Sequence, residues 1–194
     1  MATSKKIGNF QYRKAERNDI GALTELLCEL YKNHTYEELL IENKGLLGNR
    51  QQAFFLAYED DISIGICHAS LRSEYVNGKE FDGIAGYLEA IYVRPEYRLR
   101  GIASNLVTMC EEWASQNDCR EFLSDCLLDN TDSYKFHQRI GFSETERCIF
   151  FRKELTPRAE SDATIFCPML PADIDLILEG YATQGWNKPR DVLK

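Results

Sequence analysis

Four stretches of the chain carry apolar residues every three or four positions, which is the spacing of one face of an α-helix. They cover residues 18–31, 36–43, 104–114 and 131–141. Asn18 or Asp19 precedes the first apolar run as a helix cap, and Gly141 follows the last run as a helix end. The pattern therefore predicts four helices, two near the start of the chain and two in its second half.

A second pattern, apolar residues at alternate positions or in short runs, predicts β-strands. It occurs at residues 10–14, 53–58, 62–66, 86–93, 121–126 and 147–153. The acidic turn between 53–58 and 62–66 predicts an antiparallel hairpin, and Asn77-Gly78 predicts a further tight turn. Because a helix separates 86–93 from 121–126, we expect those two strands to lie parallel.

In chain order the predicted elements are β-α-α-β-β-β-α-β-α-β. This order predicts an α/β fold (α+β in some schemes) with helices on both faces of a mixed, mostly antiparallel sheet. The one parallel strand pair is expected to splay apart. Gly45 and Gly48 are expected to break the second helix. Residues 1–156 contain all of these elements and are expected to form one domain.

Residues 157–194 form an extension whose pattern repeats the start of the chain. Residues 164–170 predict a strand, Asp173-Ile174 follows, and apolar residues then continue at helical spacing. A fragment of this length cannot bury its own apolar face. We expect it to pack on the main domain, to pair with a partner chain or to remain partly disordered.

The composition indicates one folded domain with an extension rather than two domains or a disordered chain. Of 194 residues, 44% are hydrophobic and 28% charged, close to the globular average. The formal net charge of −8 argues against a nucleic-acid partner and suits a cationic ligand, although solubility alone also explains it. No apolar run approaches the roughly 20 residues of a membrane span, so we expect no membrane partner and a cytoplasmic location.

The seven cysteines are expected to be reduced thiols. Their number is odd, no Cys-x-x-Cys pair occurs, and only three histidines are available to complete a metal site. Cys67 lies among apolar residues, where cysteine acts as a small hydrophobic side chain. The sequence therefore predicts no metal site.

One turn between a strand and a helix is a candidate anion site. Residues 98–104 (Arg-Leu-Arg-Gly-Ile-Ala-Ser) follow the strand 86–93 and open a helix, whose first N–H groups have no partner within the helix. Gly101 leaves room for a phosphate, and Arg98 and Arg100 add cationic donors. The alternative is that Gly101 only forms the turn and both arginines are solvated.

Two motifs resemble the signatures of the GNAT acetyltransferase superfamily. Arg98-x-x-Gly101-x-Ala103 is similar to the Gln/Arg-x-x-Gly-x-Gly/Ala motif that cradles the pyrophosphate of acetyl-CoA. Residues 130–142 (Asn-x-x-Ser-x-x-x-His-x-x-x-Gly-Phe) are similar to the family's second landmark, Asn-x-x-Ala-x-x-x-Tyr-x-x-x-Gly-Phe. The resemblance implies a GNAT-like fold and acetyl-CoA as the cofactor, with CoA as the product and no metal.

A closer resemblance, over residues 10–155, is to the aminoglycoside 6'-N-acetyltransferases. It is carried by residues 74–78, 88–93, 119–125 and 142–150. It implies transfer of an acetyl group to the 6'-amine of an aminoglycoside, and hence antibiotic resistance, in an enzyme that forms a homodimer. The alternatives are a GNAT enzyme that acetylates another small amine such as a polyamine, or a CoA-binding module without turnover.

Glu89 and Asp125 are the candidate acid–base residues. They lie near the ends of the two strands that flank the helix 104–114, so a sheet that splays there would place both carboxylates in one cleft. An acceptor ammonium must lose a proton before it can attack a thioester. The resemblance assigns both residues to the acceptor site, with Asp125 as the candidate base. Glu89 can instead hold the cationic sugar, and both can simply be solvated.

The resemblance also implies a set of cofactor-binding residues. The strand backbone would pair with the pantetheine arm and offer an N–H group to the developing oxyanion, while the turn after it would bind the pyrophosphate. The set comprises Ile91, Tyr92, Val93, Arg98, Leu99, Arg100, Gly101, Ile102, Ala103, Ser104, Asn130, Ser133 and His137.

His137 departs from the family pattern, which usually places a tyrosine there to protonate the leaving thiolate. His137 can donate this proton or only bond the cofactor. Tyr134, one turn earlier, is a weaker candidate for the acid. If neither acts, water or the proton of the amine can serve.

Four residues are implied to line the acceptor site: Tyr31, Tyr75, Glu144 and Glu146. Tyr31 can instead belong to the apolar helix face, and Tyr75 can simply brace its turn. Glu144 and Glu146 can come from a neighbouring subunit. The extension 157–194 resembles the start of a second, truncated GNAT domain.

Overall fold

A six-stranded sheet is the framework of the described part of the chain, which comprises residues 4–73, 83–155, 174, 177 and 179 of a computed structural model. The strands are β1 (Ser4–Ile7), β2 (Phe10–Lys14), β3 (Gln52–Glu59), β4 (Ile62–Arg72), β5 (Ala85–Val93) and β6 (Phe122–Leu123). They follow one another in chain order; neighbours from β1 to β5 are antiparallel, and β5 and β6 are parallel. The predicted mixed sheet is confirmed.

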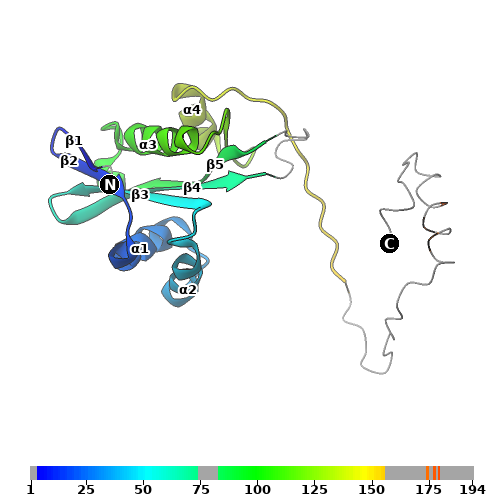
Figure 1. Ribbon diagram of the computed structural model, residues 1–194, viewed down its shortest axis with the longest axis horizontal. Helices are drawn as coiled ribbons and strands as arrows, with labels where there is room; N and C mark the ends of the chain where they lie inside the picture. Colours follow the sequence, from blue (N-terminus) through cyan, green and yellow to red (C-terminus); the bar gives the residue numbers. More distant parts are fainter. Residues whose placement is uncertain (1–3, 74–82, 156–173, 175–176, 178, 180–194) are drawn as a thin grey trace. The chain divides into compact units, whose positions relative to one another are not determined.

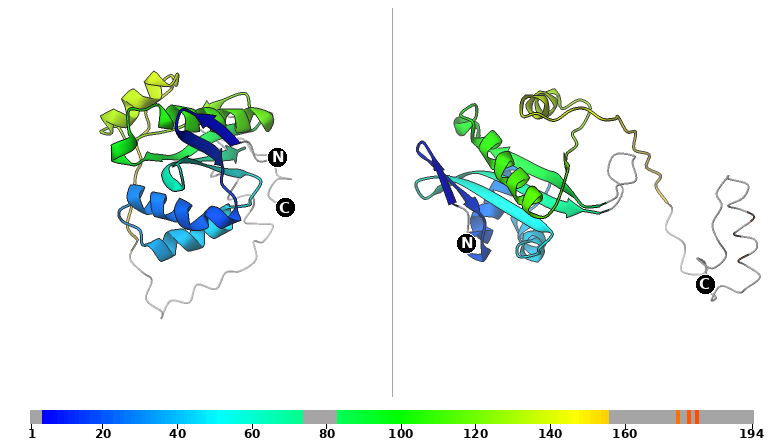
Figure 2. Two further views of the ribbon diagram at one scale, coloured as in Figure 1. Left: turned by 90° about the vertical axis from the view of Figure 1, so that its left-hand side faces the viewer. Right: turned by 45° about the horizontal axis from the view of Figure 1, so that its top comes forward.

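Helices cover both faces of this sheet. Helices α1 (Ile20–Leu30) and α2 (Tyr36–Leu46) lie on one face, while α3 (Ile102–Gln116) and α4 (Thr131–Arg139) lie on the other (Figure 1). The same division is visible in both views of Figure 2. Two single-turn 3-10 helices, η1 (Arg17–Asp19) and η2 (Pro95–Tyr97), precede α1 and α3. The four helices agree with those that the apolar spacing predicts.

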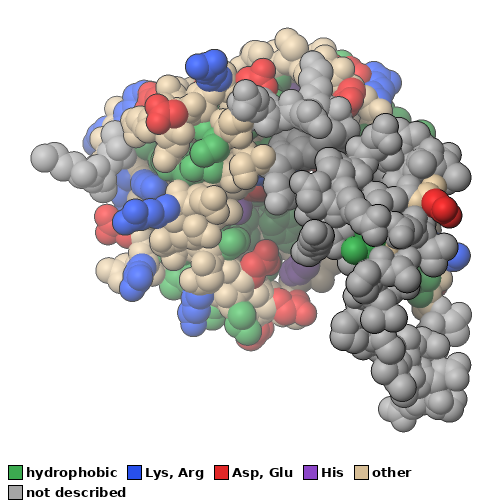
Figure 3. All heavy atoms as spheres, turned by 45° about the vertical axis from the view of Figure 1, so that its right-hand side comes forward, with side chains coloured by type: hydrophobic (Ala, Val, Ile, Leu, Met, Phe, Trp, Pro, Cys, Tyr) green, Lys and Arg blue, Asp and Glu red, His purple; other side chains and the backbone are tan. Residues whose placement is uncertain are grey.

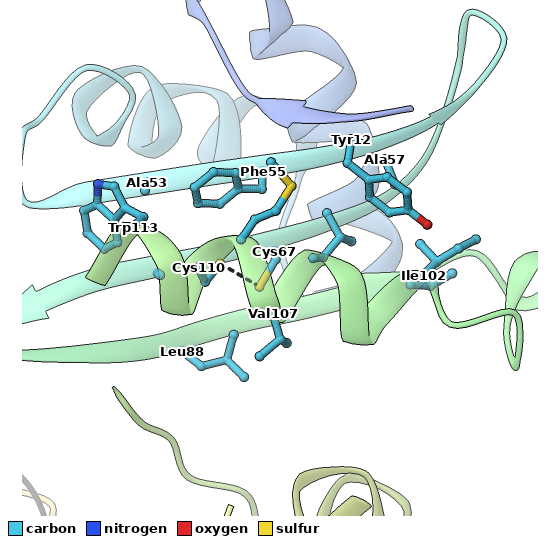
Figure 4. Packing of buried hydrophobic residues seen from close by; sticks show 14 of the residues in the cluster. Tyr12, Ala53, Phe55, Ala57, Cys67, Leu88, Ile102, Val107, Cys110 and Trp113 are labelled. Atoms are coloured by element: carbon cyan, nitrogen blue, oxygen red, sulfur yellow. Dashed lines mark hydrogen bonds between the residues drawn. The ribbon is translucent and has the colours of Figure 1, made fainter. Parts of the chain in front are cut away.

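The alternation of side chains along β3 gives the sheet a core on each face. Phe55 packs with Val107 and Trp113 of α3, as Figure 4 shows. Its neighbour Phe54 points to the opposite face and belongs to the core that holds Leu23 of α1. Full burial of each such side chain contributes roughly 1.5–3 kcal/mol, so both faces anchor the strands.

Two buried cysteines join α3 to the sheet through their side chains. The sulfur atoms of Cys67 on β4 and Cys110 on α3 lie 3.1 Å apart as free thiols (Figure 4). Burial is the main cause that raises the pKa of the Cys110 thiol. Both residues therefore serve the core as small apolar groups, in agreement with the interpretation of Cys67 from its neighbours.

The parallel pair is short, and this opens the sheet. Only Gly86 and Tyr87 of β5 pair with β6, opposite Phe122 and Leu123, while β5 continues to Val93. A Cβ atom at Gly86 would lie 2.6 Å from both the Ala114 Cβ and the Phe122 ring. Only glycine therefore allows α3 and β6 to meet β5 at the point where the two strands part.

Strand β5 has a β-bulge at Glu89. Ala69 of β4 lies opposite Leu88, and His68 lies opposite Ala90, so Glu89 has no partner residue on β4. A bulge inserts one residue into a strand and changes which face its side chain takes. Leu88 packs in the α3 core and Ala90 in the α1 core, with Glu89 between them.

Several predicted boundaries differ from the structure. Strand β1 is unforeseen: it pairs with β2 through backbone bonds although Lys5 and Lys6 give it no apolar pattern. Gly45 does not break its helix, because α2 continues to Leu46. The predicted buried strand 121–126 is wrong in extent and burial: β6 has two residues, both partly exposed, because it parts from β5 after Tyr87 and Leu123.

The predicted final strand is also wrong. Residues 147–153 belong to no strand of the described sheet, because none of the strands β1 to β6 pairs with them. The chain divides into two compact units, Met1–Cys148 and Ile149–Lys194, and all labelled strands and helices belong to the first. In the second unit, residues 174, 177 and 179 are helical. The turn at Asn77-Gly78 and most of the extension lie outside the described residues.

None of the helices in the described ranges is both long and apolar enough to cross a membrane.

Candidate active site

The turn between β5 and α3 has the backbone of an anion site. Leu99 (φ 61°) and Gly101 (φ 78°) both adopt left-handed conformations, and α3 begins directly afterwards at Ile102. A Cβ atom at Gly101 would meet no other atom within 4 Å, so space lies open beside it. The first N–H groups of α3 have no helical acceptor and carry the positive end of the helix dipole. Residues 98–104 therefore fit a pyrophosphate.

The two arginines of this turn brace it from either side. Arg98 Nε donates to the Val93 carbonyl oxygen at 3.0 Å. The Arg100 guanidinium lies 3.9 Å from Glu59 and 4.7 Å from the centre of the Phe10 ring. Arg98 thus holds the turn against the end of β5 through Nε, and the Arg100 guanidinium, at 3.9 Å from Glu59, is not hydrogen-bonded to it.

A polar cluster, which we call the carboxylate network, lies on the α1/α2 face of β4 and β5. Ser70 and Arg72 alternate with Ala69 and Leu71, which pack toward α3, so they point to the other face. The Ser70 hydroxyl donates to Glu89. The Arg72 guanidinium grips the same carboxylate, with Nη2 at 2.7 Å from each oxygen and Nε at 3.0 Å from Oε1. Glu89 shares this face with Tyr87, two residues earlier on β5, and the bulge places Ala90 on the same face.

Tyr87 extends the network across the splay to Asp125. The Tyr87 hydroxyl donates to Asp125 Oδ1, and the Arg72 guanidinium lies 3.5 Å from the centre of the Tyr87 ring. Burial first and the Asp125 carboxylate second raise the pKa of the Tyr87 hydroxyl, so it stays protonated as a donor. The predicted pair of carboxylates is thus connected through Arg72 and Tyr87, with Asp125 at the exposed end.

Tyr31 and His68 border the same network. Tyr31, at the end of α1, is 38% exposed, and burial followed by the Glu89 carboxylate raises the pKa of its hydroxyl. The His68 ring stacks on Phe54, and its Nε2 lies 2.7 Å from the Gln52 amide oxygen. Burial lowers the pKa of His68 to about 4. The ring is therefore neutral at pH 7 and adds no charge beside Glu89.

Helix α4 presents the second motif on the α3 face. The Asn130 side chain caps the helix by accepting from the Ser133 N–H at 3.1 Å. His137 Nδ1 lies 2.7 Å from the Ser133 carbonyl oxygen, so Nδ1 carries the proton of the neutral ring. His137 Nε2 then accepts from the Ser124 hydroxyl at 2.8 Å. Only a protonated His137 has a second N–H to pass on.

The remaining predicted site residues are spread more widely. Glu144 accepts from Tyr134 at 2.9 Å and pairs with Arg147, whereas Glu146 is exposed. The Tyr92 hydroxyl donates to Glu29 at 3.0 Å. Ile91 packs against the α3 core and Val93 is buried in it, which leaves their backbone for a ligand. Tyr75 lies outside the described residues.

Sequence reasoning missed Ser70, Arg72 and Tyr87 as members of the site. A signal was present for two of them, because His68, Ser70 and Arg72 occupy alternate positions of an otherwise apolar strand. Alternate positions of a strand share one face, so this spacing predicts that the three polar side chains lie side by side. Tyr87 carried no such signal, since an aromatic residue in a strand usually belongs to the core.

On the face drawn in Figure 3, most basic side chains lie toward the left of the view, whereas acidic side chains are spread over the described surface. No group of three or more His, Cys, Asp or Glu side chains within the described ranges is placed to hold a metal ion.

Known proteins resemble this chain over its first unit. Residues 20–142 match the Acetyltransferase (GNAT) family. Relatives named aminoglycoside N(6')-acetyltransferase type 1 include one from Salmonella typhimurium (strain LT2), 37% identical over 141 residues, or 73% of this chain and 97% of the relative. One from Acinetobacter baumannii is 44% identical over 131 residues, or 67% and 88%.

A solved structure shares the fold as well. It is AAC(6')-Iy in complex with the bisubstrate analog CoA-S-monomethyl-acetylneamine, with a TM-score of 0.70 and 35% identity. The match covers 75% of this chain and 99% of that chain.

Proposed function

This chain belongs to the GNAT acetyltransferase family and, within it, to the aminoglycoside 6'-N-acetyltransferases, and from this membership we propose that it transfers acetyl from acetyl-CoA to the 6'-amine of an aminoglycoside. It is an acyltransferase, and the transfer would confer resistance to these antibiotics. The observation that carries the proposal is the carboxylate network at the point where β5 and β6 part. Strand β5 leads from this network to the anion-binding turn.

Asp125 is the proposed general base. An acceptor amine arrives as an ammonium and must lose a proton to become a nucleophile. The Asp125 carboxylate is exposed and is held by the neutral Tyr87 hydroxyl, so it keeps lone pairs for that proton or for a water that relays it. A placed base contributes about 100- to 10,000-fold to the rate.

The cofactor site is proposed along β5, the turn after it and α4. Acetyl-CoA supplies the acetyl group as a thioester. The backbone N–H groups of residues 98–104 would hold its pyrophosphate, and the backbone of Ile91, Tyr92 and Val93 its pantetheine arm. Asn130 and Ser133 would border this arm at the start of α4, where the Asn130 side chain caps the helix by accepting from the Ser133 N–H.

His137 is the proposed acid for the leaving thiolate. Its neutral ring donates from Nδ1 to Ser133 and accepts at Nε2 from Ser124. The acid role therefore requires the imidazolium, whose Nε2 proton would reach the sulfur directly or through the Ser124 hydroxyl. Tyr31, Tyr75, Glu144 and Glu146 stay proposed as acceptor-lining residues.

The test of the function is thiol release from acetyl-CoA with two aminoglycosides that differ only in a 6'-amine or a 6'-hydroxyl, alongside spermidine. Turnover confined to the 6'-amine is expected. Turnover with spermidine alone would leave the fold and cofactor in place and make the protein a polyamine acetyltransferase. No turnover with any amine would contradict an enzymatic role.

Asp125→Asn tests the base in the same assay. We expect kcat to fall about 100-fold or more, with acetyl-CoA affinity retained, because the amide cannot accept the proton. Asp132→Asn, on the exposed first turn of α4, is the matched control and should keep full turnover. Unchanged kcat in Asp125→Asn would remove Asp125 from this role.

We also propose that the enzyme is a cytoplasmic homodimer without nucleic-acid or membrane partners. Phe150 and Phe151 are 92% and 93% exposed, and β6 is an edge strand of the described sheet. A second copy that covers these rings would remove their apolar surface from water. Sedimentation should then give a dimer for the natural chain and a monomer for Phe150→Ser/Phe151→Ser.

A further inference from the structure

We propose that Arg72 is an internal counter-cation of the acceptor site and thereby sets how strongly the site attracts polycations. In the free enzyme its guanidinium neutralises Glu89, so that Asp125 is the carboxylate of the network left for the reacting amine. This inference rests on the proposed function and assigns the two carboxylates different tasks.

The geometry makes Arg72 and Glu89 a closed pair. The guanidinium donates to both carboxylate oxygens, at 2.7 Å from Nη2 to each and 3.0 Å from Nε to Oε1. Ser70 donates to Oε1 as well. The lone pairs that an incoming ammonium would need on Glu89 are thus largely occupied. A planar fork on a carboxylate is also a more directional partner than a mobile ammonium.

Among the residues that the structure describes, no cation pairs with Asp125. Its partner within the network is the hydroxyl of Tyr87, which is uncharged. The Arg72 guanidinium instead lies over the Tyr87 ring, 3.5 Å from its centre, where a cation is attracted to the ring face. The network of Arg72, Glu89, Tyr87 and Asp125 therefore carries a net charge of −1, located at Asp125.

The first unit contains a second arginine–carboxylate pair beside a tyrosine, and this one has a structural role only. Arg13 grips Asp19 with two bonds of 2.6 and 2.7 Å and lies 4.8 Å from the centre of the Tyr58 ring. There the carboxylate side chain is only 11% exposed. In the network, Arg72 is 39% and Glu89 26% exposed, so a ligand can reach and compete with this pair.

The consequence is a defined response to removal of either charge. Without Arg72, Glu89 is still held by Ser70 but is no longer neutralised, so a cationic ligand gains a second anion. Without Glu89, the guanidinium is unpaired and repels the ligand. Without both charges, the ligand meets the same net charge as in the natural enzyme.

The experiment compares kanamycin binding in four full-length proteins by titration calorimetry, each saturated with CoA so that no acetyl transfer occurs. Relative to the natural chain, Arg72→Gln should bind roughly three- to tenfold more tightly and Glu89→Gln more weakly by a similar factor. The double variant Arg72→Gln/Glu89→Gln should lie within about twofold of the natural chain. Arg13→Gln is the matched control and should leave the dissociation constant unchanged.

The opposing view is that Glu89 binds the ammonium directly and Arg72 only positions it. In that case Arg72→Gln binds more weakly, and the double variant is as weak as Glu89→Gln; either result overturns the proposal. Should Arg72→Gln fail to fold, the double variant still decides, because it leaves no unpaired charge.

The outcome is separable from that of the proposed function. Binding without thiol release in the natural chain would refute the enzyme and still test Arg72. If kanamycin does not bind, spermidine replaces it as the probe in the same four proteins. Absence of binding of both polycations in all of them overturns the proposal.

Discussion

At the scale of single residues, burial decides which groups of the site carry charge. His68 and Arg72 lie on the same face of β4, four residues apart. Of the two, only Arg72 is a cation at neutral pH. The His68 ring is enclosed by Phe54 and bonded to Gln52, and removal from water disfavours its charged form. Of the His68 and Arg72 side chains on this strand, Arg72 is therefore the cation beside Glu89.

His68 predicts a pH dependence of stability with a defined sign. Its pKa is about 4 in the folded chain and about 6.5 in an unfolded one. Between pH 4 and 6.5 the His68 ring is protonated in the unfolded chain but not in the folded one, so lowering the pH favours unfolding. The stabilisation that the neutral His68 ring gives is therefore fully present above pH 6.5. It decreases as the pH falls toward 4, and the free energy of unfolding is lowered by up to about 3 kcal/mol.

Urea unfolding between pH 4 and 7 measures this effect. His68→Gln should flatten the dependence in that window, whereas His34→Gln, an exposed histidine, should not. The pKa of Asp19 is lowered, chiefly by Arg13, so its carboxyl group takes up its proton mainly below pH 4. Its effect on stability is therefore separate from that of His68. An unchanged slope in His68→Gln would show that other groups carry the dependence.

At the scale of elements, periodicity predicts which segments are helices and strands but not where a strand gains a residue. The continuous apolar run around Phe54 and the alternating isoleucines around Ile64 are enough to place β3 and β4. The bulge at Glu89 leaves no mark in the sequence, because it depends on the register between two strands. Glu89 and Asp125 were predicted as a pair from their places near the strand ends, while Arg72 and Tyr87, which link them, were not predicted.

The turn before α3 gives a prediction for an element boundary. Gly101→Ala is expected to cost about 1–2 kcal/mol, because φ is 78° there and a side chain disfavours that conformation. The strain should disturb the N–H groups of the turn and raise the KM for acetyl-CoA several-fold. Turnover assays with varied acetyl-CoA measure it.

Gly45→Ala is the control for this change. It lies within α2 with no atom near its Cβ position, so alanine should stabilise the chain by up to about 1 kcal/mol and leave the KM unchanged. Equal KM values for both variants would mean that the turn does not bind the cofactor.

At the scale of the whole molecule, all elements of the site belong to the first of two compact units. The sequence predicted a domain of residues 1–156, and the apolar run 147–153 predicted its last strand. An apolar run predicts that its side chains are buried, but the pattern does not say which surface buries them. Up to α4 the order of helices and strands was thus predictable, apart from β1 and the extent of β6, whereas the strand expected after α4 was not formed.

A chain that ends at residue 156 tests this division. We expect it to fold, to bind acetyl-CoA and to keep kcat within about twofold of the natural chain, because an independent unit retains its own core. Thermal unfolding and thiol release measure the outcome. Loss of folding would make residues 157–194 part of the domain.

Gly86 has a consequence for how such an enzyme diversifies. The opening between β5 and β6 begins at a position where even one methyl group would lie 2.6 Å from its neighbours. In a bacterial library under aminoglycoside selection, every codon except those for glycine should disappear at position 86, while position 45 accepts many. Lineages then adapt to new drugs by substitution of residues that line the opening, while Gly86 itself is retained.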